Sequence, residues 1–283
     1  MYIHINGKIM KAGEARLSPF EHGFMYGLGL FETFRVYENH PFLLDDHFRR
    51  LEEGLAMMNI RWTYERSSVE EEINLLLNAN NLQNAYVRYN ISAGEQDLGL
   101  TTSQYHNPTK IIYMKPLTPP VSSLTKKGVI LSTSRNTPEA DIRLKSHHYF
   151  NSILGKRELG DHPDEEGIFL TREGYIAEGV VSNIFWLKQG TLYTPSVDTG
   201  ILNGITRQFV MTLARKLGYY IRTGRFSLDH LLSADAAFVT NSIQEIVPLS
   251  EIDERKFKKS EDITRLKAHY ASFREKLWSR QEI

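Results

Sequence analysis

The chain has 283 residues, with 34 basic and 34 acidic side chains, so its formal net charge is zero. A chain of this length buries a large core and usually divides into two domains. The balanced charge offers no basic excess for a nucleic-acid backbone, and no apolar run approaches the roughly 20 residues that span a membrane. The chain has no cysteine and its 10 histidines show no metal-ligand spacing, which disfavours disulfides and metal sites.

The first residues, Met1 to Gly7, predict a strand and a turn, without the charged and apolar regions of a leader. We therefore expect a cytoplasmic protein that acts on a small molecule. Nucleic acid, membrane and metal are not expected among its partners.

The first part of the chain predicts a sheet with two helices. A Gly- and aromatic-rich loop at residues 17–31 suits a flat ligand or a tight core. Asp45 or Asp46 can cap the first helix, and Ser68 with Glu71 forms a capping box for the second. The alternating patterns predict strands at 2–5, 8–10, 31–37, 85–92 and 110–114, and helices from 45 to about 58 and at 69–78.

Three prolines within residues 116–120 favour an extended connection between two domains. Beyond it the patterns predict strands at 128–133, 166–171, 175–179, 182–187, 191–195 and 236–240, and helices at 153–159, about 205–217, 227–232 and 260–279. The whole pattern predicts an α+β fold with much antiparallel sheet. We expect a small N-terminal α/β domain at 1–115, a linker at 116–123 and a larger C-terminal domain at 124–283.

Lys145 has neighbours that are unusual for a lysine. It lies between an apolar run and the cluster His147, His148 and Tyr149. Lysine rarely lies among apolar residues unless a partner or a reaction keeps it there. Removal of a lysine amine from water favours the neutral form, which is the form that makes Schiff bases. A surface lysine whose stem follows apolar surface is the alternative that this stretch leaves open.

Four further features suit one anionic, aromatic ligand. Residues 204–206 open a predicted helix, where exposed N–H groups and a hydroxyl can bind an anion, and residues 241–242 add small donors. Arg50 offers a bidentate cation for a phosphate. Glu178 lies among apolar residues, where a pyridinium nitrogen is one candidate partner. With Lys145, these features describe a site for pyridoxal 5′-phosphate.

The order and spacing of these residues resemble the class IV, or fold-type IV, aminotransferases. The matching positions are Arg50, Lys145, Glu178, Ser182-Asn183, Ile205-Thr206 and Asn241-Ser242, within a resemblance that extends from Tyr26 to Pro248. This family contains branched-chain and D-amino acid aminotransferases and 4-amino-4-deoxychorismate lyase. The resemblance implies a two-domain fold like that of D-amino acid aminotransferase, pyridoxal 5′-phosphate as cofactor, and a homodimer.

The resemblance also implies a role for each matching residue. Lys145 would make the Schiff base with the cofactor and then move the proton. Tyr149 would donate to the phenolate oxygen of the cofactor, and Glu178 would keep the ring nitrogen protonated. The phosphate would be held by Arg50, Ile205, Thr206, Asn241 and Ser242, while Ser182 and Asn183 would support Glu178 and the ring.

Within the family, the chain is most similar to the 4-amino-4-deoxychorismate lyases, which release pyruvate and 4-aminobenzoate, a folate precursor, without a second keto acid. This similarity lies in residues 17–24, 143–149 and 202–209 and in Asn241. Some lyases carry an arginine in the loop after Gly94, but residues 95–99 contain none. The candidates for the substrate side are therefore Arg88, with Arg35 as a weaker choice for the carboxylate, together with Tyr26, Phe31 and Thr33.

Three alternatives remain. Residues 85–88 and 31–35 also resemble branched-chain aminotransferases. D-amino acid aminotransferase fits less well, because Phe31 occupies the place of its signature tyrosine and its substrate-loop Arg and His are absent. The third alternative is a protein of this fold that holds the cofactor without turnover.

Overall fold

The computed structural model describes residues 1–118, 120 and 123–283. The chain forms two compact units, and each is described by itself. Unit 1 comprises Met1–Pro119, Leu144–His148 and Arg274–Glu282, and unit 2 comprises Pro120–Arg143, Tyr149–Phe273 and Ile283. Residues 119, 121 and 122 of the predicted linker lie outside the described residues.

Unit 1 is built on a six-stranded antiparallel sheet with strand order β2-β1-β6-β5-β3-β4. Its strands are β1 (Tyr2–Ile5), β2 (Lys8–Lys11), β3 (Gly29–Tyr37), β4 (His40–Pro41), β5 (Ala85–Ser92) and β6 (Thr109–Pro116). Its helices are α1 (His22–Tyr26), α2 (Leu44–Met57) and α3 (Arg66–Asn80), with short 3₁₀ turns at Ala12–Glu14 and Arg280–Glu282.

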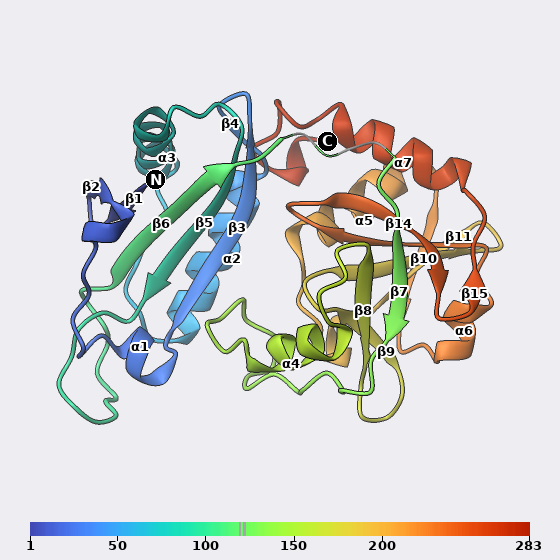
Figure 1. The fold of residues 1–283 in the computed structure, drawn as a ribbon, viewed down its shortest axis with the longest axis horizontal. Coiled ribbons are helices and arrows are strands. Elements are labelled where there is room, and N and C mark those ends of the chain that lie inside the picture. Colours follow the sequence, from blue (N-terminus) through green and yellow to red (C-terminus); the bar gives the residue numbers. More distant parts are fainter. Residues whose placement is uncertain (119, 121–122) are drawn as a thin grey trace. The chain divides into compact units, whose positions relative to one another are not determined.

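Helices α2 and α3 cover one face of this sheet (Figure 1). Side chains alternate between the two faces of a strand, so Leu30, Phe34 and Val36 of β3 point into the core that these helices close. Leu51 and Leu55 of α2 meet them there. The intervening residues of β3 and β5 lie on the other face, which no helix of unit 1 covers among its described residues.

Two segments join unit 1 that the predicted domain boundaries assign to the C-terminal domain. Residues 144–148 pair with β3 through an antiparallel bridge between Leu30 and Ser146. Residues 274–282 contact the start of α2, where Leu43 N–H donates to the Leu277 carbonyl at 3.0 Å. Leu30 and Ser146 are more than 100 residues apart in the sequence. The local pattern around Lys145 therefore could not indicate that this segment belongs to unit 1.

Unit 2 contains a nine-stranded mixed sheet with order β12-β11-β10-β13-β14-β7-β8-β9, and β15 pairs with β14. Its strands are β7 (Lys126–Ile130), β8 (Glu165–Leu170), β9 (Ile176–Gly179), β10 (Asn183–Lys188), β11 (Thr191–Pro195), β12 (Tyr220–Gly224), β13 (Ala236–Asn241), β14 (Glu245–Ile252) and β15 (Arg255–Lys256). Most pairs are antiparallel, but β7 pairs in parallel with both β14 and β8, and β11 pairs in parallel with β12.

The helices of unit 2 are α4 (Phe150–Leu159), α5 (Ile205–Lys216), α6 (Leu228–Leu232) and α7 (Glu261–Ala271), with a 3₁₀ turn at Val197–Thr199. The last helix is shorter than the predicted 260–279, because the chain beyond it leaves unit 2. Helix α5 buries Phe209 against Tyr270 of α7, with ring centroids 5.2 Å apart. The α+β fold class is confirmed.

None of the helices in the described ranges 1–118 and 123–283 is both long enough and apolar enough to cross a membrane.

Candidate active site

Lys145 of unit 1 lies against the aromatic ring of Phe31. Its Nζ is 4.5 Å from the ring centroid. The backbone holds this arrangement, since Phe31 N–H donates to the Lys145 carbonyl and His147 N–H donates to the Gly29 carbonyl, both at 3.0 Å. The amine is therefore presented by strand-like pairing and not by a flexible loop.

Arg88 of β5 lies on the same aromatic ring. Its guanidinium carbon is 3.6 Å from the Phe31 centroid, and its Nε donates to Asn90 Oδ1 at 3.1 Å. Among the residues that the structure describes, no carboxylate forms an ion pair with Arg88. Arg35 differs, because it is buried and its guanidinium donates to the Thr118 carbonyl at 2.9 Å. Of the two predicted carboxylate partners, Arg88 is the one whose terminal nitrogens have the fewer protein contacts.

Arg50 of α2 is engaged with Glu32 of β3. Its Nε and one terminal nitrogen donate to the two carboxylate oxygens at 2.7 and 2.6 Å. Burial acts to raise the pKa of Glu32, but Arg50 and His47 outweigh it and lower this pKa to about 2. Burial also lowers the pKa of His47, so at neutral pH Arg50 supplies the charge and His47 Nδ1 a hydrogen bond at 2.7 Å. The pair fixes the Arg50 side chain, and its predicted contact with a phosphate stays a prediction.

Replacing Glu32 by glutamine is expected to lower the free energy of unfolding by about 3 kcal/mol, because it leaves a half-buried Arg50 without its counter-charge. The folded-state pKa lies below the ordinary value of 4.5, so the pair stabilises above that pH and loses its effect as the pH falls toward 2. Urea denaturation at pH 7 and pH 3 measures both effects. Glu53→Gln, at an exposed position of α2, is the control and should change stability by no more than about 0.5 kcal/mol. An unchanged stability for Glu32→Gln would contradict this account.

Glu178 lies at the end of β9 in unit 2, where it is 3 % exposed. Arg135 donates to its Oε1 from two nitrogens, at 2.8 and 2.7 Å, and Arg143 Nε lies 3.7 Å from the same oxygen. Its Oε2 accepts from the Leu202 N–H at 3.0 Å and from Asn183 Nδ2 at 3.3 Å. Two arginines, one backbone N–H and one amide therefore surround this buried carboxylate.

Asn183, the first residue of β10, connects Glu178 to the loop before α5. Besides its contact with Glu178, its Nδ2 donates to the Leu202 carbonyl at 2.8 Å. A side chain at Gly204 would collide with Asn183 Oδ1, so glycine is needed where this loop enters the helix. Glu178 and the start of α5 are thereby held in one arrangement.

The N-terminus of α5 is suited to an anion. Its N-cap, Gly204, provides no side-chain hydrogen bond to the first turn, and the helix dipole favours negative charge there. Thr206 Oγ1 lies 3.0 Å from Ser242 Oγ, so the structure brings these two predicted phosphate contacts together. Asn241 differs, since its Oδ1 accepts from the Ile243 and Gln244 N–H groups at 2.9 and 2.8 Å and thus forms the turn between β13 and β14.

Ser182 makes its hydrogen bond away from Glu178. Its Oγ donates to Glu166 Oε1 at 2.6 Å, and Glu166 Oε2 accepts from Lys126 Nζ at 3.0 Å. All three side chains are buried. The Gly179 N–H donates to the Ser182 carbonyl at 2.8 Å, so this network fixes the turn that follows Glu178.

The remaining predicted site residues are distributed over both units. Tyr149 is the N-cap residue of α4 in unit 2 and is half-buried. Tyr26 ends α1 in unit 1, where its hydroxyl accepts from the Gly99 N–H at 3.1 Å. Thr33 pairs with Arg88 across β3 and β5. Ile205 is buried in the first turn of α5.

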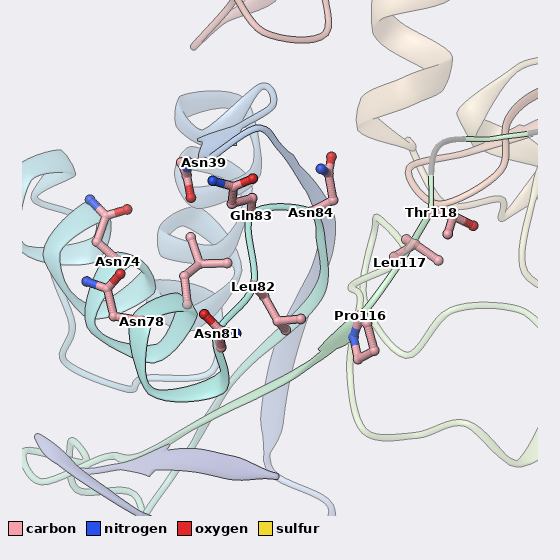
Figure 2. A pocket seen from close by; sticks show the side chains of 11 residues that line it. Asn39, Asn74, Asn78, Asn81, Leu82, Gln83, Asn84, Pro116, Leu117 and Thr118 are labelled. Carbon is pink, nitrogen blue, oxygen red and sulfur yellow. The ribbon is translucent and has the colours of Figure 1, made fainter.

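A separate open hollow of unit 1 lies beside the end of α3 and the end of β6 (Figure 2). Amide side chains dominate its lining, from Asn39, Asn74, Asn78, Asn81, Gln83 and Asn84. One of them, Asn81, has a structural role, because it adopts the left-handed conformation that ends α3. None of the predicted site residues lines this hollow.

Sequence reasoning missed the arginines at Glu178 and the Glu32–His47–Arg50 network. Glu32 was detectable in principle, because it is an acidic residue at a core-facing position of an alternating strand. Arg135 was not, since it lies 43 residues from Glu178 in an irregular stretch.

Several known proteins are similar to this chain. The family model described as amino-transferase class IV matches residues 29–252. The aminodeoxychorismate lyase of Bacillus subtilis (strain 168) is 49% identical over 254 residues, which cover 89% of this chain and 87% of that protein. A putative branched-chain-amino-acid aminotransferase of Methanocaldococcus jannaschii is 34% identical, over 90% of this chain and 89% of that one.

A solved structure has the same fold. The branched-chain amino acid aminotransferase of Thermobaculum terrenum, in its PLP-form, superposes with a TM-score of 0.85 at 25% identity, over 97% of this chain and 94% of that chain. Its fold confirms the predicted two-domain, fold-type IV architecture. The family model spans well over half of the present sequence. This chain belongs to the class IV aminotransferase family.

Proposed function

We propose that this protein is a pyridoxal 5′-phosphate-dependent 4-amino-4-deoxychorismate lyase, which splits its substrate into 4-aminobenzoate and pyruvate for folate synthesis. The observation that carries the proposal is the Arg88 guanidinium, which lies over the Phe31 ring, as the Lys145 amine does, and has no carboxylate partner among the described residues. The 49% identity to the Bacillus subtilis lyase supports the choice of reaction.

The residues of each unit fit the cofactor. Unit 2 provides two hydroxyls 3.0 Å apart at an uncapped helix start, which suits a phosphate, and the buried carboxylate of Glu178, which suits a pyridinium nitrogen. Unit 1 provides a lysine amine held by backbone pairing. The family and the PLP-form of its Thermobaculum terrenum relative agree with this choice of cofactor.

The proposed roles follow from these positions. When bound, the cofactor supplies a sink for the electrons that proton removal leaves behind. Lys145 Nζ would hold the cofactor and, once the amine of the substrate has taken its place, would remove the proton on the ring carbon that bears this amine. Glu178 would pair with the protonated ring nitrogen. The carbon–oxygen bond to the enolpyruvyl group then breaks, and the same proton, returned by Lys145 Nζ, gives pyruvate.

Other residues hold the reactants. Thr206, Ser242 and Ile205, with Asn241 and Arg50, are proposed to bind the phosphate, and Tyr149 the phenolate oxygen. Asn183 and Ser182 support Glu178, through the contacts described above. Tyr26, Phe31 and Thr33 line the substrate side, and Arg88 binds a carboxylate. A homodimer and a cytoplasmic location complete the proposal.

Branched-chain aminotransferase is the second candidate, because relatives of that activity match at 34% and 32% identity over 90% of the chain. The two reactions differ in their need for a keto acid. In a transaminase the amine passes to 2-oxoglutarate and forms glutamate, whereas the lyase keeps the amine on its aromatic product.

The test offers the holoenzyme chorismate with an amidating synthase in one assay, and branched-chain amino acids with 2-oxoglutarate in the other. We expect 4-aminobenzoate in the first assay and at most trace glutamate in the second. Rapid glutamate formation without 4-aminobenzoate would replace the lyase assignment by the transaminase one.

A further inference from the structure

The open face of the unit 1 sheet collects several polar side chains around Phe31. Strand register places Phe31 opposite Asn90 and Thr33 opposite Arg88. Leu30 and Ser146 are paired in an antiparallel bridge, so both side chains point to the core face of the sheet. Lys145 and His147, the residues before and after Ser146, point to the opposite face, which is the face of Phe31, because successive residues of a strand alternate between the two faces. His147 therefore joins Lys145 and Arg88 on one surface.

His147 packs closely within this group. Its ring lies 6.2 Å from the Phe31 ring at an interplanar angle of 23°. A side chain at Gly29 would come within 2.5 Å of the His147 ring, so glycine at this position makes room for the imidazole. The ring is thus held in place by the same strand that holds the lysine.

One nitrogen of His147 has no protein partner. Its Nε2 is buried and makes no hydrogen bond to any residue in the described parts of the chain. Burial, followed by the charges of Arg88 and His148, lowers the pKa of His147 to about 4. The imidazole is therefore neutral at pH 7, and it can give or accept one hydrogen bond at Nε2.

The charge of Arg88 is not balanced within the sheet. Its guanidinium lies over Phe31, it forms no ion pair with a residue that the structure describes, and no acidic residue occupies the facing positions of β3, β5 or β6 that pair there. A buried polar atom without a partner and a cation without a counter-charge are both costly. An incoming carboxylate would satisfy both at once.

We propose that His147 Nε2 and Arg88 together bind the enolpyruvyl carboxylate of the substrate, with His147 as the residue that sets the preference for this second carboxylate. This inference rests on the proposed lyase function. The enolpyruvyl group is attached beside the carbon that bears the reacting amine, so its carboxylate lies close to Lys145. The other carboxylate, on the opposite side of the substrate ring, lies farther from that amine.

The experiment measures ligand binding to the holoenzyme by titration calorimetry. Chorismate serves as the probe with both carboxylates, since it carries a hydroxyl in place of the amine and so cannot displace Lys145. The comparison probe is 4-hydroxybenzoate, which keeps the ring carboxylate and lacks the enolpyruvyl group. The variants are His147→Leu, His147→Gln, whose amide reaches the position of Nε2, and His148→Leu at the exposed neighbouring imidazole.

We expect His147→Leu to bind chorismate about 10- to 100-fold more weakly, as for the loss of a hydrogen bond to a charged group, with little change for 4-hydroxybenzoate. His147→Gln should recover most of the chorismate affinity, and His148→Leu should retain all of it. The cofactor absorbance and melting temperature of each variant establish that it is folded.

Equal weakening of both ligands in His147→Leu, or unchanged chorismate binding, would overturn the assignment of His147 while leaving the lyase function intact. Failure of the unmodified enzyme both to bind chorismate and to form 4-aminobenzoate would instead reject the proposed function, and this inference with it.

Discussion

Replacing Lys145 by alanine is expected to remove the covalently bound cofactor and to reduce turnover by at least about 10³-fold, since the side chain serves both as attachment point and as proton carrier. The purified wild-type protein should be yellow and the variant should lose the absorbance of the attached cofactor. Borohydride reduction followed by peptide mass analysis should place the cofactor on Lys145 in the wild type alone.

The substitution Lys145→Ala should remove the amine without disturbing the fold. The backbone of residues 145 and 147, and not the lysine side chain, makes the hydrogen bonds to Phe31 and Gly29, so alanine should leave the local fold in place. Lys115→Ala is a matched control, because Lys115 Nζ also lies over an aromatic ring of unit 1, 4.9 Å from the Tyr86 centroid. Full activity of Lys145→Ala, or loss of colour in Lys115→Ala, would show that the lysine has been misassigned.

Replacing Glu178 by alanine is expected to slow the reaction about 10²- to 10³-fold, as for the loss of one electrostatic group at a reacting centre, while the cofactor remains bound. The contact between Thr206 and Ser242, at the proposed phosphate site, does not itself include this carboxylate. The arginines add a second effect that the sequence did not reveal. Removal of Glu178 leaves Arg135 and Arg143 without their counter-charge and should cost about 3 kcal/mol of stability.

Single-turnover rates, cofactor absorbance and urea denaturation separate these effects. Glu166→Gln is the control for the stability term, because Glu166 is another buried carboxylate of unit 2 that pairs with a cation, Lys126. It should lose similar stability but keep most of its activity per folded molecule. Parallel loss of cofactor and activity in Glu178→Ala would indicate that Glu178 has only a structural role.

The local parts of the fold could be predicted from the sequence because each rests on short-range patterns. The alternation in 31–37 and 85–92 corresponds to β3 and β5, and Ser227 caps α6 as its pattern indicates. The last helix was predicted too long. The helix ends at Ala271. Farther along, the Leu277 and Trp278 carbonyls accept from the Leu43 and Asp45 N–H groups at the start of α2 instead of continuing the helix.

Long-range pairing is the part that local patterns do not contain. The sequence patterns predicted no strand around Lys145, yet these residues pair with β3 of unit 1. Arg50 was expected to be available for a phosphate, and the structure adds Glu32 as its ion-pair partner. The neighbours that matter are distant in the sequence. Strand pairing brings β3 to the residues around Lys145, and the packing of α2 on the sheet brings Glu32 to Arg50.

The central claim is that this chain is a lyase that needs no keto acid. The most direct measurement supplies purified holoenzyme with 4-amino-4-deoxychorismate alone and quantifies 4-aminobenzoate and pyruvate over time. The proposed function predicts equal amounts of both products and no effect of added 2-oxoglutarate. Absence of 4-aminobenzoate, or product formation only when a keto acid is present, would contradict it.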